Sequence, residues 1–179
     1  MTAQRQERNV SHGETGIRPG IALIALLTGL AWVSLGALTC LPFAARAATT
    51  ERVVVNRYSG LAIEGFDPVA YFVNARPMVG RADFEVSESG AVWRFRNEGN
   101  RASFVAHPDI YGPQFGGYDP ISLAQGVTFA GNPRFWLISG ERLYLFGREE
   151  HRDAFAADPE QFLPQANARW PQLEQDLAQ

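Results

Sequence analysis

The stretch Gly-Gly-Tyr-Asp-Pro-Ile-Ser at residues 116–122 decides the fold, because it matches an earlier stretch of the same chain. Residues 65–70 read Gly-Phe-Asp-Pro-Val-Ala, with the same order of glycine, aromatic residue, aspartate, proline, aliphatic residue and small residue. The match continues at an offset of 51 or 52 residues in the pairs Trp93-Arg94-Phe95 with Tyr144-Leu145-Phe146, Arg101 with Arg152, Phe104 with Phe155, and 106–109 with 157–160. So regular an offset indicates two copies of one unit.

Each copy predicts a short helix, a β-hairpin and a second helix. Asp67-Pro68 and Asp119-Pro120 are typical helix starts, with aspartate as the N-cap and proline in the first turn. Alternating polar and apolar residues on either side of Ser89-Gly90 and of Ser139-Gly140 indicate the hairpins. The predicted second helices are 98–106 and 149–157. The expected core residues are Trp93, Phe95, Phe104, Trp136, Tyr144, Phe146 and Phe155.

A unit of about 50 residues is too small to bury a good core by itself, so the two copies should share one. The sequence therefore predicts an α+β fold built from two tandem repeats. The expected domain covers residues 62–171, with repeat one at about 62–114 and repeat two at about 115–165. Residues 48–61 form a lead-in segment before this domain, and residues 172–179 form a C-terminal tail.

Residues 1–47 are predicted to be a signal peptide or an N-terminal membrane anchor. Residues 21–43 carry no charge, and the Ala45-Arg46-Ala47 sequence that follows is typical of a cleavage site after Ala47. The apolar run is also long enough to span a bilayer, so an uncleaved anchor in the inner membrane is the alternative. Both alternatives give a periplasmic or exported domain.

The composition excludes several classes of function. Cys40, the only cysteine, lies within the apolar run, so a cleaved protein has no disulfide, thiolate metal site or cysteine nucleophile. The chain has no lysine, which removes Schiff-base chemistry and a P-loop. After Ala47 there are 12 arginines and 17 acidic residues, a formal net charge of −5 that disfavours binding to nucleic acid.

These residues resemble the YHS domain family, a small module usually regarded as metal-binding. The resemblance covers about residues 62–171 and is strongest with secreted bacterial members that read Gly-Tyr-Asp-Pro-Val-Ala-Tyr-Phe and later Pro-Gln-Tyr-Gly-Gly-Tyr-Cys. The corresponding stretches here are 65–72 and 113–119, where Asp119 stands in place of the final cysteine. The aromatic strand that ends at Phe95 and the segment 106–111 add to the likeness.

This chain departs from the family at the positions where metal-binding members carry cysteine. By position, those places are Ala70, Arg96 and Asn100 in repeat one, and Ser122, Gly147 and His151 in repeat two. Only His151 is a plausible ligand among these six, so the usual soft-metal site is not expected.

The remaining candidate residues each have a structural and a functional interpretation. Asp67 and Asp119 are expected to cap helices rather than to bind a hard metal ion or to act as acids. Arg101 and Arg152 can grip an anionic ligand, although pairing with a nearby carboxylate, such as Asp67 or Asp119, is favoured. Tyr118 and the two glycines before it can line a pocket at the joint between the repeats, or the glycines simply turn the chain.

The sequence therefore favours an exported, non-catalytic module that binds an envelope protein or a small ligand, without a cofactor. The alternative is a metal-binding or metal-delivery protein that holds copper or zinc through His107, His151 and carboxylates. An enzyme is not expected, because these residues give no nucleophile with an adjacent base.

Overall fold

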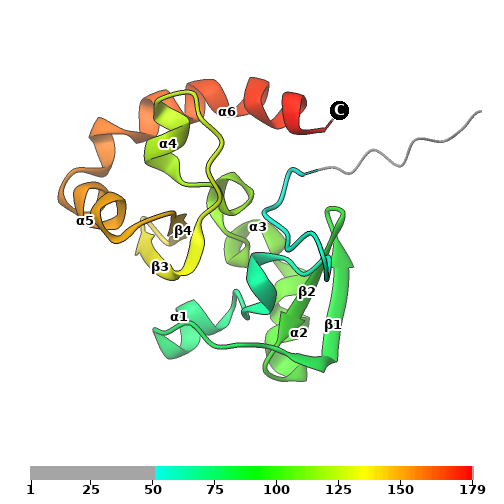
Figure 1. Cartoon of the computed structure of the whole chain (residues 1–179). Helices are drawn as coiled ribbons and strands as arrows, with labels where there is room; N and C mark the ends of the chain where they lie inside the picture. The colour runs from blue at the N-terminus through cyan, green and yellow to red at the C-terminus, as the bar shows by residue number, and fades with distance from the viewer. Residues whose placement is uncertain (1–50, 179) are drawn as a thin grey trace, which may run out of the picture. The chain divides into compact units, whose positions relative to one another are not determined.

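The computed structural model describes residues 51–178, which form an α+β fold (Figure 1). The elements of repeat one are η1 (Ile63–Gly65), α1 (Ala70–Asn74), β1 (Arg81–Glu88), β2 (Ala91–Phe95), α2 (Glu98–Ala106) and α3 (Pro108–Tyr111). Those that follow are η2 (Gln114–Gly117), α4 (Pro120–Ala124), β3 (Asn132–Ser139), β4 (Arg142–Phe146), α5 (Glu149–Ala157), η3 (Pro159–Gln161) and α6 (Leu163–Leu177). Among the helices of residues 51–178, none is long and apolar enough to cross a bilayer.

The two repeats agree in the detail of their hairpins. Strand β1 pairs antiparallel with β2, and β3 pairs antiparallel with β4. The register shifts between Arg81 and Glu85 in the first hairpin and between Asn132 and Trp136 in the second, at equivalent positions. Both residues between the strands have positive φ in each hairpin, which matches a type I′ turn. The second turn is Gly140-Glu141, one residue later than the sequence predicts.

In both repeats, the backbone just before the hairpin packs closely against another part of the same repeat. Gly80 N–H donates to the carbonyl of Gly65, and Gly131 N–H donates to that of Gly117. A Cβ atom on Gly80 would lie 2.5 Å from the carbonyl carbon of Arg94, and one on Gly131 would lie 2.6 Å from the Cβ of Leu145. Glycine is therefore required at both places, so that the chain can cross its own hairpin.

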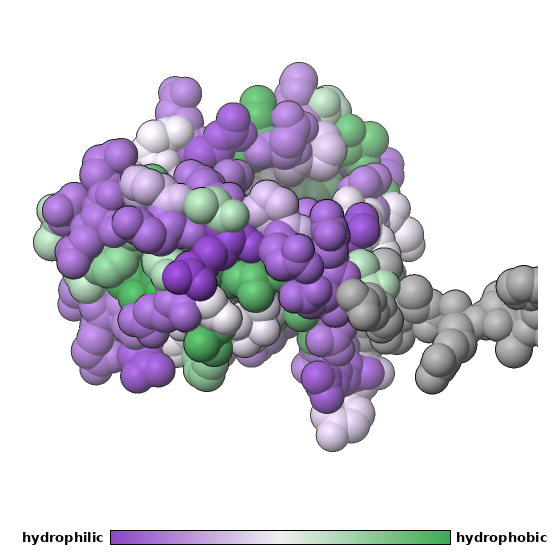
Figure 2. Space-filling model, turned by 90° about the horizontal axis from the view of Figure 1, so that it is seen from above, coloured by the Kyte–Doolittle hydropathy of each residue, from purple (hydrophilic) through white to green (hydrophobic). Residues whose placement is uncertain are grey.

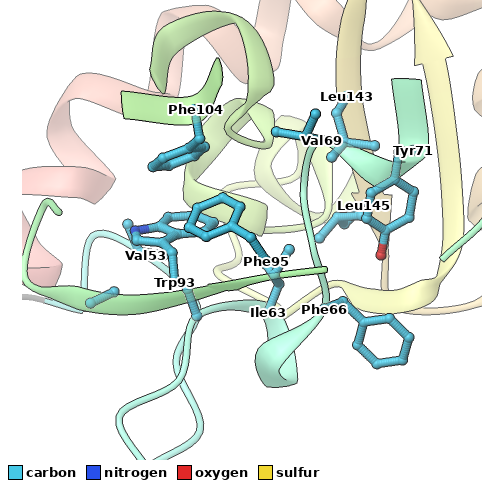
Figure 3. Packing of buried hydrophobic residues seen from close by; sticks show 12 residues of the cluster. Val53, Ile63, Phe66, Val69, Tyr71, Trp93, Phe95, Phe104, Leu143 and Leu145 are labelled. Carbon is cyan, nitrogen blue, oxygen red and sulfur yellow. The ribbon is translucent and has the colours of Figure 1, made fainter. Parts of the chain in front are cut away.

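Strand β4 connects two buried clusters. Side chains alternate between the faces of a strand, and here Leu143 and Leu145 enter the first cluster while Tyr144 and Phe146 enter the second. Figure 3 shows Leu143 and Leu145 beside Val69 and Tyr71 of repeat one. The repeats thus share this strand, as expected for units too small to bury a core alone.

Aromatic packing repeats in the two clusters. In the first cluster, the Phe104 ring lies 4.9 Å from that of Trp93 and 5.2 Å from that of Phe95. In the second, Phe155 lies at the same two distances from Tyr144 and Phe146. Six of the seven expected core residues are buried, and Trp136 is half-buried against Tyr71.

The lead-in segment and α6 close the fold across the joint between the repeats. Val53 belongs to the first buried cluster, whereas Val54 packs against the second. The Val54 N–H donates to the Gly116 carbonyl, and the Glu51 N–H donates to the carbonyl of Leu177 at the end of α6. Helix α6 includes most of the predicted tail and packs its apolar face against the second cluster.

Candidate functional site

Asp67 is a fully buried carboxylate that organises repeat one. Its Oδ1 accepts hydrogen bonds from the backbone N–H groups of Val69 at 2.9 Å and Ala70 at 3.2 Å, at the start of α1. Its Oδ2 accepts from the backbone N–H of Arg96 at 2.8 Å and from the side-chain Nδ2 of Asn100 at 2.6 Å. One aspartate therefore ties together the first helix, the end of β2 and the second helix.

Asp119 does the same in repeat two. Its Oδ1 accepts from the backbone N–H groups of Ile121 at 2.9 Å and Ser122 at 3.1 Å, which caps α4. Its Oδ2 accepts from the backbone N–H of Gly147 at 2.7 Å and lies 2.7 Å from Nδ1 of His151. The predicted capping role is confirmed for Asp119. Asp67 makes the equivalent two bonds, but the N-cap residue of α1 itself is Val69.

The six positions singled out by comparing the two repeats, three in each, lie around these two carboxylates. In repeat one, Ala70, Arg96 and Asn100 all donate to Asp67. In repeat two, the same three positions donate to Asp119, the third of them through the His151 imidazole. In both repeats, residues from the first helix, the end of the hairpin and the second helix therefore meet at one buried aspartate.

The predicted carboxylate partners of Arg101 and Arg152 were wrong. Arg101 binds Glu98, and Arg152 binds both Glu149 and Asp153, in ion pairs at the surface. Each arginine lies three residues after its glutamate on the same helix, where the two side chains meet directly. These pairs raise the pKa of both guanidinium groups through their hydrogen bonds to the carboxylates.

The two histidines have different surroundings. His107 is exposed at the end of α2, whereas the side chain of His151 is 19% exposed and is held by Asp119. Within residues 51–178, no group of three or more His, Cys, Asp or Glu side chains has the arrangement of a metal site. The structure therefore does not gather His107 and His151 into the ligand cluster that the metal alternative requires.

Tyr118 lies at the joint and lines a cavity of about 290 Å³, together with Glu51, Arg57 and Thr128. Its hydroxyl donates to the Glu51 carbonyl at 2.7 Å, so it also holds the lead-in segment. Burial, and secondarily the charge of Glu51, raise the pKa of this phenol. Gly116 also lines two further cavities at the joint, whereas Gly117 lines none of them. Both glycines have positive φ, as the alternative interpretation of a chain turn predicts.

Sequence reasoning missed the contribution of Asn100. It is the buried amide that completes the hydrogen bonding of Asp67, and its alignment with His151 in the repeat was the available signal. All fully buried side-chain polar atoms in the described residues have hydrogen-bond partners. The cleavage position at Ala47 and the apolar run 21–43 lie outside the described residues.

Comparison with known proteins gives no match to a family model, to a curated protein or to a solved structure.

Proposed function

We propose that this chain is an exported, non-catalytic module of the YHS type that binds a protein partner or a small ligand in the cell envelope. The observation that carries this proposal is the hydrogen bonding of Asp67 and Asp119. Each buried carboxylate accepts four hydrogen bonds from its own repeat, two on each oxygen. A carboxylate with its acceptor sites so occupied holds the fold together and has little capacity left for a substrate or metal ion.

The distribution of apolar residues on the surface favours a partner or ligand that binds in a cavity rather than on a broad apolar face. The face in Figure 2 is mostly hydrophilic, with apolar residues in small separate groups. Ligand sites form preferentially where structural units meet, and the cavities of this domain surround the joint between the repeats.

One observation favours the alternative of copper or zinc binding. A carboxylate that holds one ring nitrogen of a histidine orients the other nitrogen, and metal sites use this arrangement. Asp119 holds Nδ1 of His151, while the side chain remains partly exposed. On this alternative, Nε2 of His151 provides one ligand, and further ligands must come from outside the described cluster.

Native mass spectrometry of the protein isolated from its own envelope, without added metal or chelator, tests both functions. A bound protein or organic ligand that persists in the His151→Asn variant supports the binding module. Copper or zinc that is lost in His151→Asn, but kept in the matched variant His107→Asn, supports the metal alternative. A chain that carries no bound mass in the wild type contradicts both.

A further inference from the structure

Three adjoining cavities form one groove along the joint between the repeats, which we name the joint groove. The first, of about 330 Å³, is lined by Arg52, Ser89, Trp170 and Glu174 among others. The second, of about 270 Å³, shares Val53, Ser89 and Gly116 with the first. The third, of about 340 Å³, shares Pro108, Asp109, Gly112 and Pro113 with the second. These shared linings make the groove continuous.

Segments far apart in the sequence build the joint groove. The lead-in segment, the turn between β1 and β2, and the second half of α6 lie on one side of the molecule (Figure 1) and all line its first cavity. Helix α3 and the start of β4 continue it through the third cavity. The groove therefore exists only when both repeats and α6 are folded together.

The floor and the rim of the joint groove differ in chemistry. The half-buried Trp170 and two prolines give the floor most of its apolar surface, while Trp93 and Phe104 are almost fully buried and add only their edges. Three acidic residues, Glu88, Asp109 and Glu174, line the groove together with two arginines, Arg52 in the first cavity and Arg142 in the third. The Arg142 guanidinium donates to the backbone carbonyl of Asp109 at 2.8 Å. None of these three carboxylates has a salt-bridge partner within residues 51–178. The groove thus has an apolar base, and acidic side chains outnumber arginines at its edge.

We propose that the joint groove binds an extended peptide segment of a partner protein, one that carries a lysine or arginine beside apolar residues. This assignment rests on the proposed function and names its site and its class of partner. Apolar side chains of the peptide pack on Trp170, where an adjacent cation is also attracted to the aromatic ring. Its basic side chain pairs with Glu88, Asp109 or Glu174, and this charge complementarity selects against acidic segments.

The test is selection of a phage-displayed library of random dodecapeptides on the full chain held in lipid nanodiscs. The expected result is enrichment of peptides that contain a basic residue and apolar neighbours. Their affinity should fall at least tenfold in the double variant Glu88→Gln/Glu174→Gln. The matched control is Glu150→Gln/Glu160→Gln, which removes the same charge from exposed residues of α5 and η3 that line none of the joint-groove cavities.

Fluorine NMR of protein labelled with 5-fluorotryptophan locates the bound peptide. Binding in the joint groove shifts the signals of Trp93 and Trp170 and leaves that of Trp136, which packs against Tyr71, unchanged. Enrichment of acidic peptides, equal affinity for the two double variants, or shifts at Trp136 alone would overturn this assignment. Shifts at Trp136 alone would mean that the chain binds peptides at another site, which contradicts the groove assignment but not the proposed function. If no peptide is enriched, the groove assignment is wrong.

Discussion

Asn100 and His151 occupy the same position in the two repeats, and each side chain donates to the buried aspartate of its own repeat. The distances from the donor nitrogen to Oδ2 are 2.6 Å for Asn100 and 2.7 Å for His151. A neutral amide and an imidazole thus do the same structural work. Only the imidazole has a second ring nitrogen that can bind another group. Repeat one, which has the amide instead, therefore shows that the fold itself does not need this second nitrogen.

Replacing His151 by asparagine should therefore leave the stability nearly unchanged. His151→Asn copies repeat one, and we expect the free energy of unfolding to change by less than about 1 kcal/mol. His151→Ala removes a hydrogen bond to a buried carboxylate and should cost about 1.5–3 kcal/mol. Urea unfolding measures both, with the exposed His107→Ala as the control. Equal losses for the asparagine and alanine variants would contradict the equivalence of the two positions.

Asp67→Asn and Asp119→Asn should each destabilise the protein by about 3 kcal/mol. The amide turns an NH₂ group toward N–H donors, so two buried hydrogen bonds are lost and the donors are left without a partner. Thermal unfolding followed by circular dichroism measures the loss. Asp83→Asn, which affects only a surface ion pair with Arg81, should change stability by no more than about 1 kcal/mol. A small effect at Asp67 would show that its hydrogen bonds are dispensable.

Arg101→Ala and Arg152→Ala should each change the free energy of unfolding only slightly. Both residues form ion pairs at the surface, where solvent screens the charges. Chemical denaturation in low and high salt checks this, because the small contribution should shrink further as salt rises. A loss comparable to that of Asp67→Asn would place these arginines in the buried network after all.

Tyr71 should make the protein sensitive to alkaline pH. Burial, assisted by the charges of Asp67 and Glu64, raises the pKa of its phenol above the ordinary value of 10.0. Below pH 10 both folded and unfolded chains keep this proton, and the stabilisation is fully present. Above pH 10 the unfolded chain loses the proton first, so stability falls as the pH rises toward the folded-state pKa.

The matched test of this pH dependence is Tyr71→Phe. At pH 8 this variant should lose about 1 kcal/mol, because the hydroxyl donates to the Pro133 carbonyl at 2.8 Å. Between pH 9 and 11 its free energy of unfolding should decline less steeply than that of the wild type. Parallel declines in the two proteins would rule out Tyr71 as the group responsible.

Local signals in the sequence predicted most of the fold. The helices Glu98–Ala106 and Glu149–Ala157 have the predicted bounds, and both hairpins form where alternating residues flank a glycine-containing turn. The helix starts at Asp67 and Asp119 were predictable because a cap acts within three residues of the chain. In each case, the signal and the structure that it specifies lie in the same short segment.

These local signals do not predict contacts between residues far apart in the sequence. Asn100 reaches back 33 residues to Asp67, and no local pattern distinguishes that bond from a pairing with Arg101. The arginines instead meet glutamates one helical turn away, the shorter and less costly arrangement. Likewise, the sequence indicates a pocket at the joint but not the part of α6 in its wall, because Trp170 joins Gly116 only through the tertiary fold.

The contact between Glu51 and Leu177 has a consequence for the order of folding. The chain leaves the ribosome from its N-terminus, so the lead-in segment emerges long before its partner at the end of α6. Repeat one can form its hairpin and its aspartate network early, yet it lacks Leu143 and Leu145 of β4 until repeat two has been made. Completion of the fold must therefore wait for almost the whole chain, and a protein truncated before Trp170 should be exposed to proteases even though both repeats are present.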